Sequence, residues 1–315
     1  MAFELDHRLK GYPIVADATT IDHIGARQWH VLDDAMPYPL ATLRASALMH
    51  NLAWMQAWAQ RKGVQLAPHG KTTMSPQLYQ LQLSAGAWAI SFATVYQAGI
   101  GVAHGVRRVL IANQVLQAAD LDGLAHLLAT TPGLEAMFLV DSIAQIEQIE
   151  HWRASRSSAI VFAVLLELGL AGGRTGCRTH EQALALARLA HASRAVRLAG
   201  IECYEGLAAT GDDAQDRERT HALMDRVEAI ARACDGEGLF DTEEVIVSAG
   251  GSAVFDLVAP RLRPALALYF ALGVALVTVF LRYQVLDPPA PGAESTCRWP
   301  CASRTTRWQK ARPRP

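Results

Sequence analysis

The chain has 315 residues, of which 51% are hydrophobic, and a formal net charge of −1. This composition is typical of a globular protein with one large core or two smaller ones, and it excludes a largely disordered chain. The near-neutral charge argues against a dedicated nucleic-acid-binding or membrane-surface protein, because the basic footprint of such a protein is missing. We therefore expect neither a nucleic acid nor a membrane as a partner.

The five cysteines are scattered and odd in number, so they do not form a disulfide framework. This pattern favours a reducing, cytoplasmic setting. The first residues, MAFELDHRLKGYPIV, carry acidic side chains and have no apolar core of signal-peptide length. We therefore expect no export signal.

From Leu40 onward, short apolar runs alternate with longer segments of helical period. The predicted strands are 39–44, 64–68, 87–93, 108–112, 136–140, 159–166, 196–203 and 244–248. The predicted helices are 45–62, 75–85, 95–104, 118–130, 142–154, 180–193 and 216–234. Strands that alternate with helices in this way predict an α/β fold, a (β/α)8 barrel of the TIM type. A doubly wound open sheet is the alternative, since periodicity does not show closure.

The character of the chain changes near its C-terminus. Residues 265–281 carry no charge, and the run is slightly short for a membrane span, so we favour a buried helix or paired strands there. Residues 297–315 carry only basic charges, which is typical of a disordered end or of a tail that binds nucleic acid or acidic lipid. The predicted organisation is an N-terminal segment, 1–38, a barrel, 39–260, and an incomplete or aberrant, partly disordered C-terminal region, 261–315.

The segment APHGKTT, residues 67–73, follows the second predicted strand. It places His69 and Lys71 at the carboxyl end of that strand, which is the end of a barrel where chemistry is done. An amine in a partly apolar pocket has a lowered pKa and becomes a nucleophile toward an aldehyde. A surface lysine in a loop is the alternative for this segment taken alone.

Three further strand ends are unusual. The sixth strand leads to a glycine-rich loop with Arg174, the seventh ends at Tyr204, and the eighth runs into the turn SAGGS, residues 248–252. A glycine-rich turn before a helix frees backbone N–H groups that suit a phosphate. Arg174 can offer a rigid fork to an oxygen anion or a phenolate. An amine, an arginine and a phosphate cradle together predict a pyridoxal phosphate site.

The motifs PHGKT, GAWAISFATVYQA, GRTG, YEG and SAGGS follow one another between about residues 40 and 256. In this order they resemble the D-threonine aldolase and D-serine dehydratase family, pyridoxal phosphate enzymes whose barrel is of the alanine racemase N-terminal kind, known as fold type III. The glycine before Lys71 and the SAGGS turn are most similar to the branch called amino acid deaminase, or D-serine-deaminase-like.

The resemblance implies a role for each candidate residue. Lys71 would be the Schiff-base lysine and the base at the substrate α-carbon. The implied cofactor-binding residues are Lys71, His69, Arg174, Tyr204, Ser248, Gly250, Gly251 and Ser252.

The sequence departs from the family pattern in its metal site. Family members carry a second, β-rich domain whose histidine and nearby cysteine or aspartate bind a divalent metal, zinc or manganese. Here the last histidine is His221, and Cys297 and Cys301 have no partner of metal-ligand spacing, so we assign no metal ligand. We hypothesise that the tail is an out-of-frame or otherwise aberrant end, which sequencing of the encoding DNA would test.

We therefore expect a pyridoxal-phosphate-dependent lyase that acts on small D-amino acids. The expected reaction is dehydration and deamination of a D-serine- or D-threonine-type substrate to a 2-oxo acid and ammonia, impaired if the metal site is lost. Retro-aldol cleavage of the D-threonine aldolase type, or a barrel that binds the cofactor without turnover, are the alternatives. A homodimer is expected from the family. An interaction module that uses the basic tail is a further class, and salt-sensitive binding would identify it.

Overall fold

The computed structural model describes residues 4–205, 210–251, 254–261 and 268–272. The chain divides into two compact units, Met1–Leu48 and Met49–Pro315. The division into 1–38, 39–260 and 261–315 stays a prediction.

The first unit contains little regular structure. Its strands β1 (Glu4–Leu5) and β2 (Thr19–Thr20) pair antiparallel, and a short 3-10 helix, η1, covers Ile24–Arg27. The predicted strand over 39–44 is wrong, because this segment is not a strand and Leu43 is 62% exposed. A short apolar stretch indicates burial only when a partner strand is available, and the structure places another strand in the sheet instead.

The second unit is built on one parallel sheet whose strands lie in the order β3-β10-β9-β8-β7-β6-β5-β4. The strands are β3 (Gln65–Leu66), β4 (Ile90–Phe92), β5 (Arg108–Gln114), β6 (Glu135–Val140), β7 (Phe162–Leu168), β8 (Val196–Cys203), β9 (Val245–Ala249) and β10 (Leu268–Leu272). The helices are α1 (Ala45–Lys62), α2 (Pro76–Ser84), α3 (Val95–Ala103), α4 (Ala118–Thr130), α5 (Ile143–Ser155), α6 (His180–Ala192), α7 (Asp213–Gly236) and α8 (Phe255–Val258), with a 3-10 turn, η2 (Gly70–Thr72), after β3. The predicted α/β architecture of alternating strands and helices is confirmed.

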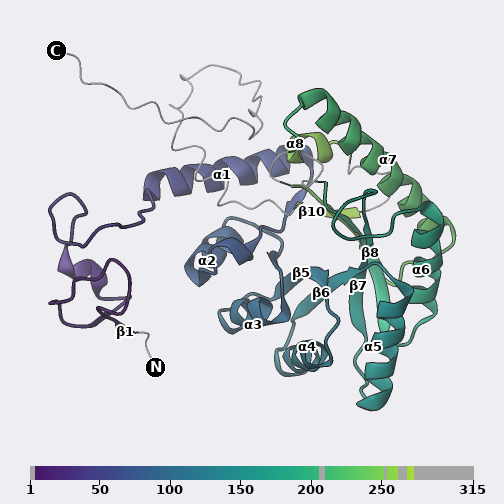
Figure 1. The fold of residues 1–315 in the computed structure, drawn as a ribbon, viewed down its shortest axis with the longest axis horizontal. Helices are drawn as coiled ribbons and strands as arrows, with labels where there is room; N and C mark the ends of the chain where they lie inside the picture. The colour runs from purple at the N-terminus through teal and green to yellow at the C-terminus, as the bar shows by residue number, and fades with distance from the viewer. Residues whose placement is uncertain (1–3, 206–209, 252–253, 262–267, 273–315) are drawn as a thin grey trace. The chain divides into compact units, whose positions relative to one another are not determined.

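Hydrogen bonds connect the two ends of this strand order. The N–H groups of Trp88 and Ala89 donate to the carbonyl of Leu66 at 2.8 and 3.4 Å, and the N–H of Ser91 donates to Pro68 at 2.9 Å. The sheet therefore curls until its end strands meet, which favours a barrel over an open sheet. Figure 1 shows helices α2 to α7 arranged around the outside of the curled sheet.

Strand β10 lies within the uncharged run 265–281. It pairs with β9 on one side and with β3 on the other. Of the two structures that we favoured for this run, paired strands are confirmed for the five residues of β10. Among the residues that the structure describes, every helix is too short or too polar to span a bilayer.

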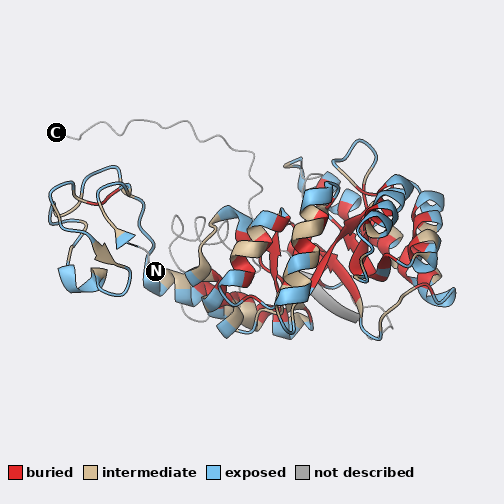
Figure 2. Ribbon diagram, turned by 90° about the horizontal axis from the view of Figure 1, so that it is seen from below, coloured by how far each residue is buried: buried red, intermediate tan, exposed pale blue. Residues whose placement is uncertain are grey.

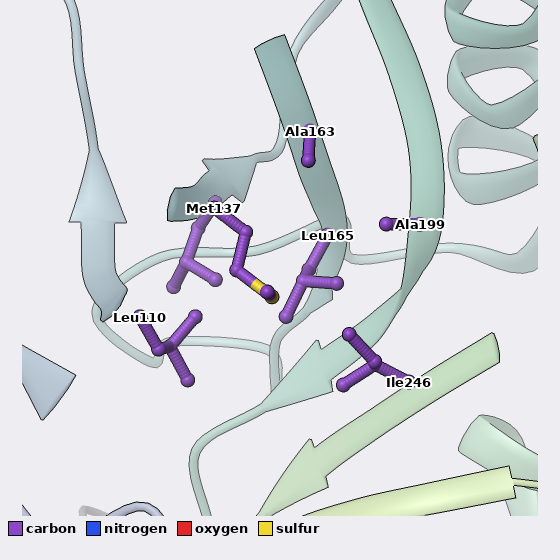
Figure 3. Packing of buried hydrophobic residues seen from close by; sticks show 7 residues of the cluster. Leu110, Met137, Ala163, Leu165, Ala199 and Ile246 are labelled. Carbon is purple, nitrogen blue, oxygen red and sulfur yellow. The ribbon is translucent and has the colours of Figure 1, made fainter. Parts of the chain in front are cut away.

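The core is made by alternate residues of the strands. On the inner face of the sheet, side chains from β5 to β9 pack against one another (Figure 3), and they are Leu110, Met137, Leu139, Ala163, Leu165, Ala199 and Ile246. Strand β7 is buried along its whole length, including Glu167, as the apolar run 159–166 that it overlaps predicts for a strand covered on both faces. Figure 2 shows these buried strands beneath helices whose outer faces are exposed.

The helices begin directly after the strands because the sequence provides caps at these places. Thr94, Ser142 and Thr179 each accept a hydrogen bond from the backbone N–H of a glutamine three residues later, at 3.2, 3.4 and 3.1 Å. At Thr179 the glutamine side chain also accepts from the cap backbone at 3.2 Å, which completes a capping box. The turns after β4 and β6 are thereby short, whereas the connections from β7 to α6 and from β8 to α7 are longer loops at the carboxyl ends of the strands.

Candidate active site

A cavity of about 270 Å³ lies at the carboxyl ends of the strands. It brings together candidate residues from four strand ends: His69, Lys71, Arg174, Tyr204, Ser248, Gly250 and Gly251. Ser252, the eighth candidate, lies outside the described residues. The structure thus places these side chains at one site, while their roles in cofactor binding stay predictions.

The turn that carries Lys71 is set by close packing at Gly70. A Cβ atom at Gly70 would lie 2.8 Å from Tyr79 Cε1 and 2.9 Å from Phe92 Cε1, so only glycine fits beside these buried rings. The Tyr79 hydroxyl donates to the Gly70 carbonyl at 3.0 Å, and Tyr79 packs edge-on against Phe92. The next residue, Lys71, is thereby held at the cavity.

The electrostatics around Lys71 favour its neutral amine. Partial burial, and then the positive charge of Arg174, lower the pKa of Lys71. Burial, and then the charge of Lys71, lower the pKa of His69 to about 4, so its imidazole is neutral at physiological pH. The Nδ1 atom of His69 is buried without a hydrogen-bond partner. An amine with a lowered pKa beside an unsatisfied imidazole nitrogen is chemically suited to an aldehyde-bearing aromatic ligand.

Arg174 lies on the loop between β7 and α6 and points back across the site. Its Nη2 atom donates to Asn113 Oδ1 at 2.9 Å, and the Asn113 amide donates in turn to the Ala93 carbonyl at 3.2 Å. The loop bends sharply at Gly176, which has φ of +93° and whose Cβ would lie 2.4 Å from the Gly169 nitrogen. A glycine is required there, and the GRTG motif is explained by the bend.

Sequence reasoning did not identify two amides at the end of β5. A register shift between Ile111 and Gln114 turns the end of this strand, and the Gln114 side chain donates to the carboxyl of Glu167. Thr175 also donates to Glu167, at 2.5 Å, while burial raises the pKa of Glu167. The sequence did contain a signal for Asn113 and Gln114, because both are polar and directly follow the predicted strand 108–112.

A buried carboxylate occupies the glycine turn after β9. Glu205 is 1% exposed, and its two oxygens accept from the backbone N–H groups of Gly250 at 3.3 Å and Gly251 at 2.5 Å. Burial raises the pKa of Glu205, and the backbone hydrogen bonds oppose that rise. These N–H groups are the ones that the sequence predicted for a phosphate. The YEG motif contained Glu205, but nothing in its spacing indicated this contact.

A second buried acid, Glu202, faces the same cavity from β8. Its Oε2 atom is buried without a hydrogen-bond partner. Burial, together with the charges of Glu167 and Glu205, raises its pKa well above the ordinary value. An unsatisfied buried carboxyl of this kind is typical of a functional site.

The site extends beyond the first cavity. A second cavity of about 380 Å³ is lined by the loop 167–175, Tyr204 and Arg219. The two cavities share Glu167, Arg174 and Tyr204. Together they offer room for a cofactor-sized molecule and a small substrate beside it.

The residues present fit pyridoxal phosphate at its aldehyde end. Lys71 has a lowered pKa, His69 offers an unsatisfied buried nitrogen, and Arg174 lines the same cavity. At the phosphate end, the N–H groups of the turn are bonded to Glu205, a carboxylate that takes the place of an anion there. In the described part of the chain, no group of three or more His, Cys, Asp or Glu side chains could hold a metal ion, so we assign no metal ligands.

Comparison with known proteins places this site in a family. The family model for the alanine racemase N-terminal domain matches residues 43–272. The 3-hydroxy-D-aspartate aldolase of Paracoccus denitrificans (strain Pd 1222) is 27% identical over 219 residues, which are 69% of this chain and 55% of that protein. The chain thus spans little more than half the length of this relative.

Solved structures share the fold. The D-threonine aldolase from Filomicrobium marinum has a TM-score of 0.67 at 24% identity, over 82% of this chain and 66% of that chain. The D-threo-3-hydroxyaspartate dehydratase from Delftia sp. HT23 has a TM-score of 0.62 at 24% identity, over 78% and 63%. The resemblance that the motifs predicted is confirmed, and the chain belongs to the alanine racemase N-terminal domain family.

Proposed function

We propose that this chain binds pyridoxal phosphate through Lys71 and acts as a lyase on small β-hydroxy D-amino acids. The observation that supports this most is the cavity in which Lys71, with its lowered pKa, faces Arg174 and the Gly250–Gly251 turn. When bound, the cofactor would supply an electron sink for the carbanion that forms at the substrate α-carbon.

In this proposal, the amine Nζ of Lys71 holds the cofactor and then accepts the proton from the substrate α-carbon. Arg174, itself hydrogen-bonded to Asn113, offers its guanidinium to an anionic oxygen of the cofactor ring. His69 and Tyr204 line the ring site, and Ser248, Gly250, Gly251 and Ser252 hold the phosphate.

Two reactions on a β-hydroxy amino acid suit this site equally well. Loss of the α-proton and the β-hydroxyl as water gives an enamine, which hydrolyses to a 2-oxo acid and ammonia. Cleavage between the α- and β-carbons gives glycine and an aldehyde, and the hydroxyl proton is lost to a base. Similar proteins are named for both, an aldolase and a dehydratase, so we propose the lyase and leave both reactions as candidates.

Covalent labelling tests the cofactor half of the proposal. Protein incubated with pyridoxal phosphate and then treated with borohydride is digested and analysed by mass spectrometry. We expect the reduced adduct on Lys71 and its loss in Lys71→Ala, while Lys62→Arg, which keeps a cation on α1, is labelled as the native chain is. A label spread over several lysines, or no label at all, would reject Lys71 as the cofactor residue.

Product analysis then separates the reactions. D-serine, D-threonine and D-threo-3-hydroxyaspartate are incubated with the loaded protein, with and without added zinc or manganese, and ammonia, 2-oxo acid and aldehyde are measured. Ammonia with a 2-oxo acid identifies dehydration, and glycine with an aldehyde identifies aldol cleavage. A label on Lys71 without any product would identify a cofactor-binding protein instead of a lyase.

We also propose a homodimer in a reducing, cytoplasmic setting. Cys177, Cys203 and Cys234 are free and buried, which supports a reducing compartment. Sedimentation of the loaded protein over a range of concentrations measures the oligomeric state, and a monomer at every concentration would argue against the dimer.

A further inference from the structure

The contact between Glu205 and the glycine turn has the geometry of an anion in its binding site. Both carboxylate oxygens are used, one for the Gly250 N–H at 3.3 Å and one for the Gly251 N–H at 2.5 Å. The side chain is 1% exposed. In the described part of the chain, an internal carboxylate therefore holds the N–H groups that a bound anion would need.

The charged surroundings of Glu205 do not compensate for its charge. Besides burial, its charge raises the pKa of the neighbouring Glu202, Cys203 and Tyr204, and the charge of Glu167 on β7 also raises the pKa of Glu202 and Cys203. Two cationic side chains, Lys71 and Arg174, line the same cavity as Gly250 and Gly251. His69 also lines it, but its imidazole is neutral at physiological pH. In the part of the chain that the structure describes, the hydrogen bonds to the Glu205 carboxylate come from backbone N–H groups.

We propose that Glu205 makes anion binding at the Gly250–Gly251 turn proton-coupled, so that a doubly charged anion binds there with uptake of one proton by the Glu205 carboxyl. The proposal rests on the proposed function where that anion is the cofactor's phosphate. Glu205 is thus a specificity-determining residue that sets the charge which the turn accepts.

The physical reason is competition for the same donors. A dianion and an ionised carboxylate cannot both accept from the N–H groups of Gly250 and Gly251, and they repel each other at contact distance in a buried site. A protonated Glu205 removes the repulsion and offers an O–H donor to the anion. Burial already raises the pKa of Glu205, so this proton is available closer to neutral pH than it is for an exposed glutamate.

Linkage gives the size of the effect. Where free Glu205 is ionised and the bound form is protonated, the affinity for a dianion falls up to about tenfold for each unit of rising pH. Arg174 stays charged throughout this pH range, and Lys71 favours anions more as the pH falls, but both act with or without Glu205. The comparison of native and Glu205→Gln proteins therefore isolates the contribution of this carboxyl.

The test uses sulfate, because it stays a dianion throughout the relevant pH range whereas phosphate titrates within it. Sulfate affinity is measured by calorimetry on the full chain from about pH 5 to about pH 8, a range that begins near the ordinary pKa of a glutamate and extends in the direction in which burial shifts the pKa of Glu205. The variants are Glu205→Gln and the control Glu135→Gln, which removes a carboxyl at the start of β6, at the opposite end of the strands from the cavity. Circular dichroism of each variant verifies the fold.

We expect the affinity of the native chain and of Glu135→Gln to fall steeply with pH, and the affinity of Glu205→Gln to be higher at pH 8 and to change little. An equal slope in the native chain and Glu205→Gln, an equal effect of both variants, or no sulfate binding by any form would overturn the proposal. If Glu205→Gln does not fold, calorimetry of the native chain in two buffers of different ionisation enthalpy decides: up to one proton taken up per sulfate is expected, and none would overturn it.

A second experiment distinguishes failure of the proposed function from failure of the proton coupling. Labelling of Lys71 with pyridoxal, which has no phosphate, does not depend on the glycine turn. A labelled Lys71 with an unchanged pH slope in Glu205→Gln rejects the proton coupling alone. An unlabelled Lys71 with a flattened slope rejects the cofactor role of Lys71 and leaves a proton-coupled anion site.

Discussion

The Nη1 atom of Arg226 donates to the backbone carbonyl of Gly169 at 2.7 Å, and the same guanidinium also donates to the carbonyl of Cys177. Arg226 lies on α7, whereas Gly169 and Cys177 are the two ends of the loop that carries Arg174. One side chain therefore holds both ends of this loop, and the position of Arg174 over the cavity depends on a residue that does not line it.

We expect Arg226→Met to weaken the binding of pyridoxal phosphate about tenfold or more, because the loop loses two charge-assisted hydrogen bonds of about 1.5–3 kcal/mol each. Labelling of Lys71 by a saturating concentration of pyridoxal should persist. Titration of the bound cofactor by absorbance measures the change. The control is Arg232→Gln on the same helix, whose exposed pair with Glu228 should contribute little. Unchanged affinity in Arg226→Met would show that the loop keeps its position without this contact.

Gly70→Ala should destabilise the fold by about 1–3 kcal/mol, because its methyl group would overlap the rings of Tyr79 and Phe92. Urea denaturation followed by circular dichroism measures the free energy of unfolding. Gly236→Ala is the matched control, since a Cβ there meets nothing within 4 Å. If both variants lose the same small amount of stability, the packing at Gly70 is not the reason for this glycine.

The pH dependence of the reaction of the Lys71 amine should show how burial and the charge of Arg174 shift its pKa. Burial and then Arg174 lower the pKa of Lys71 from the ordinary lysine value of 10.5, so the rate of reaction with pyridoxal should reach half its maximum below that pH. Removing the arginine charge in Arg174→Gln should raise the pKa and move the midpoint to higher pH. Arg219→Gln, which alters the adjoining cavity, should leave the midpoint in place. A native midpoint at or above that of free lysine would contradict the lowered pKa.

Glu202→Gln should stabilise the protein at alkaline pH. Burial and two neighbouring carboxylates raise the pKa of Glu202 in the folded state. The stability associated with this carboxyl is therefore full below the unfolded pKa and is lost as the pH rises through the folded pKa. The neutral amide does not titrate, so the Tm difference between Glu202→Gln and the native chain should widen from pH 5 to pH 8. A constant difference across this range would show that Glu202 does not titrate abnormally.

Local patterns predicted most of the elements. The helix predicted over 45–62 and the strand predicted over 196–203 coincide with α1 and β8. The buried residues of α1 follow the helical period, and β8 is an apolar run that is buried at all positions but one, so in both cases a short segment contains the information needed. The cap residues, such as Thr179 with Gln182, act within a single turn and are equally readable.

Non-local relationships were not predictable in the same way. The segment 39–44 has the composition of a strand, but β10 instead lies beside β3, and only the pairing distinguishes them. Likewise, the contact of Glu205 with Gly250 and Gly251 joins residues that are far apart in sequence. The YEG and SAGGS motifs identified the neighbourhood of the site, but which side chain satisfies which backbone group depends on the folded sheet.

The position of β10 has a kinetic consequence. It joins β9 to β3, which lies about two hundred residues earlier in the chain, and this is the most distant strand pairing of the sheet. Contacts between such distant segments carry a large loop-closure cost, and they are expected to form late in folding. Lys71 follows β3 and the Gly250–Gly251 turn follows β9, so the two walls of the cavity come together only at this final step. A cofactor that bridges them would bind only the closed sheet and would slow its unfolding.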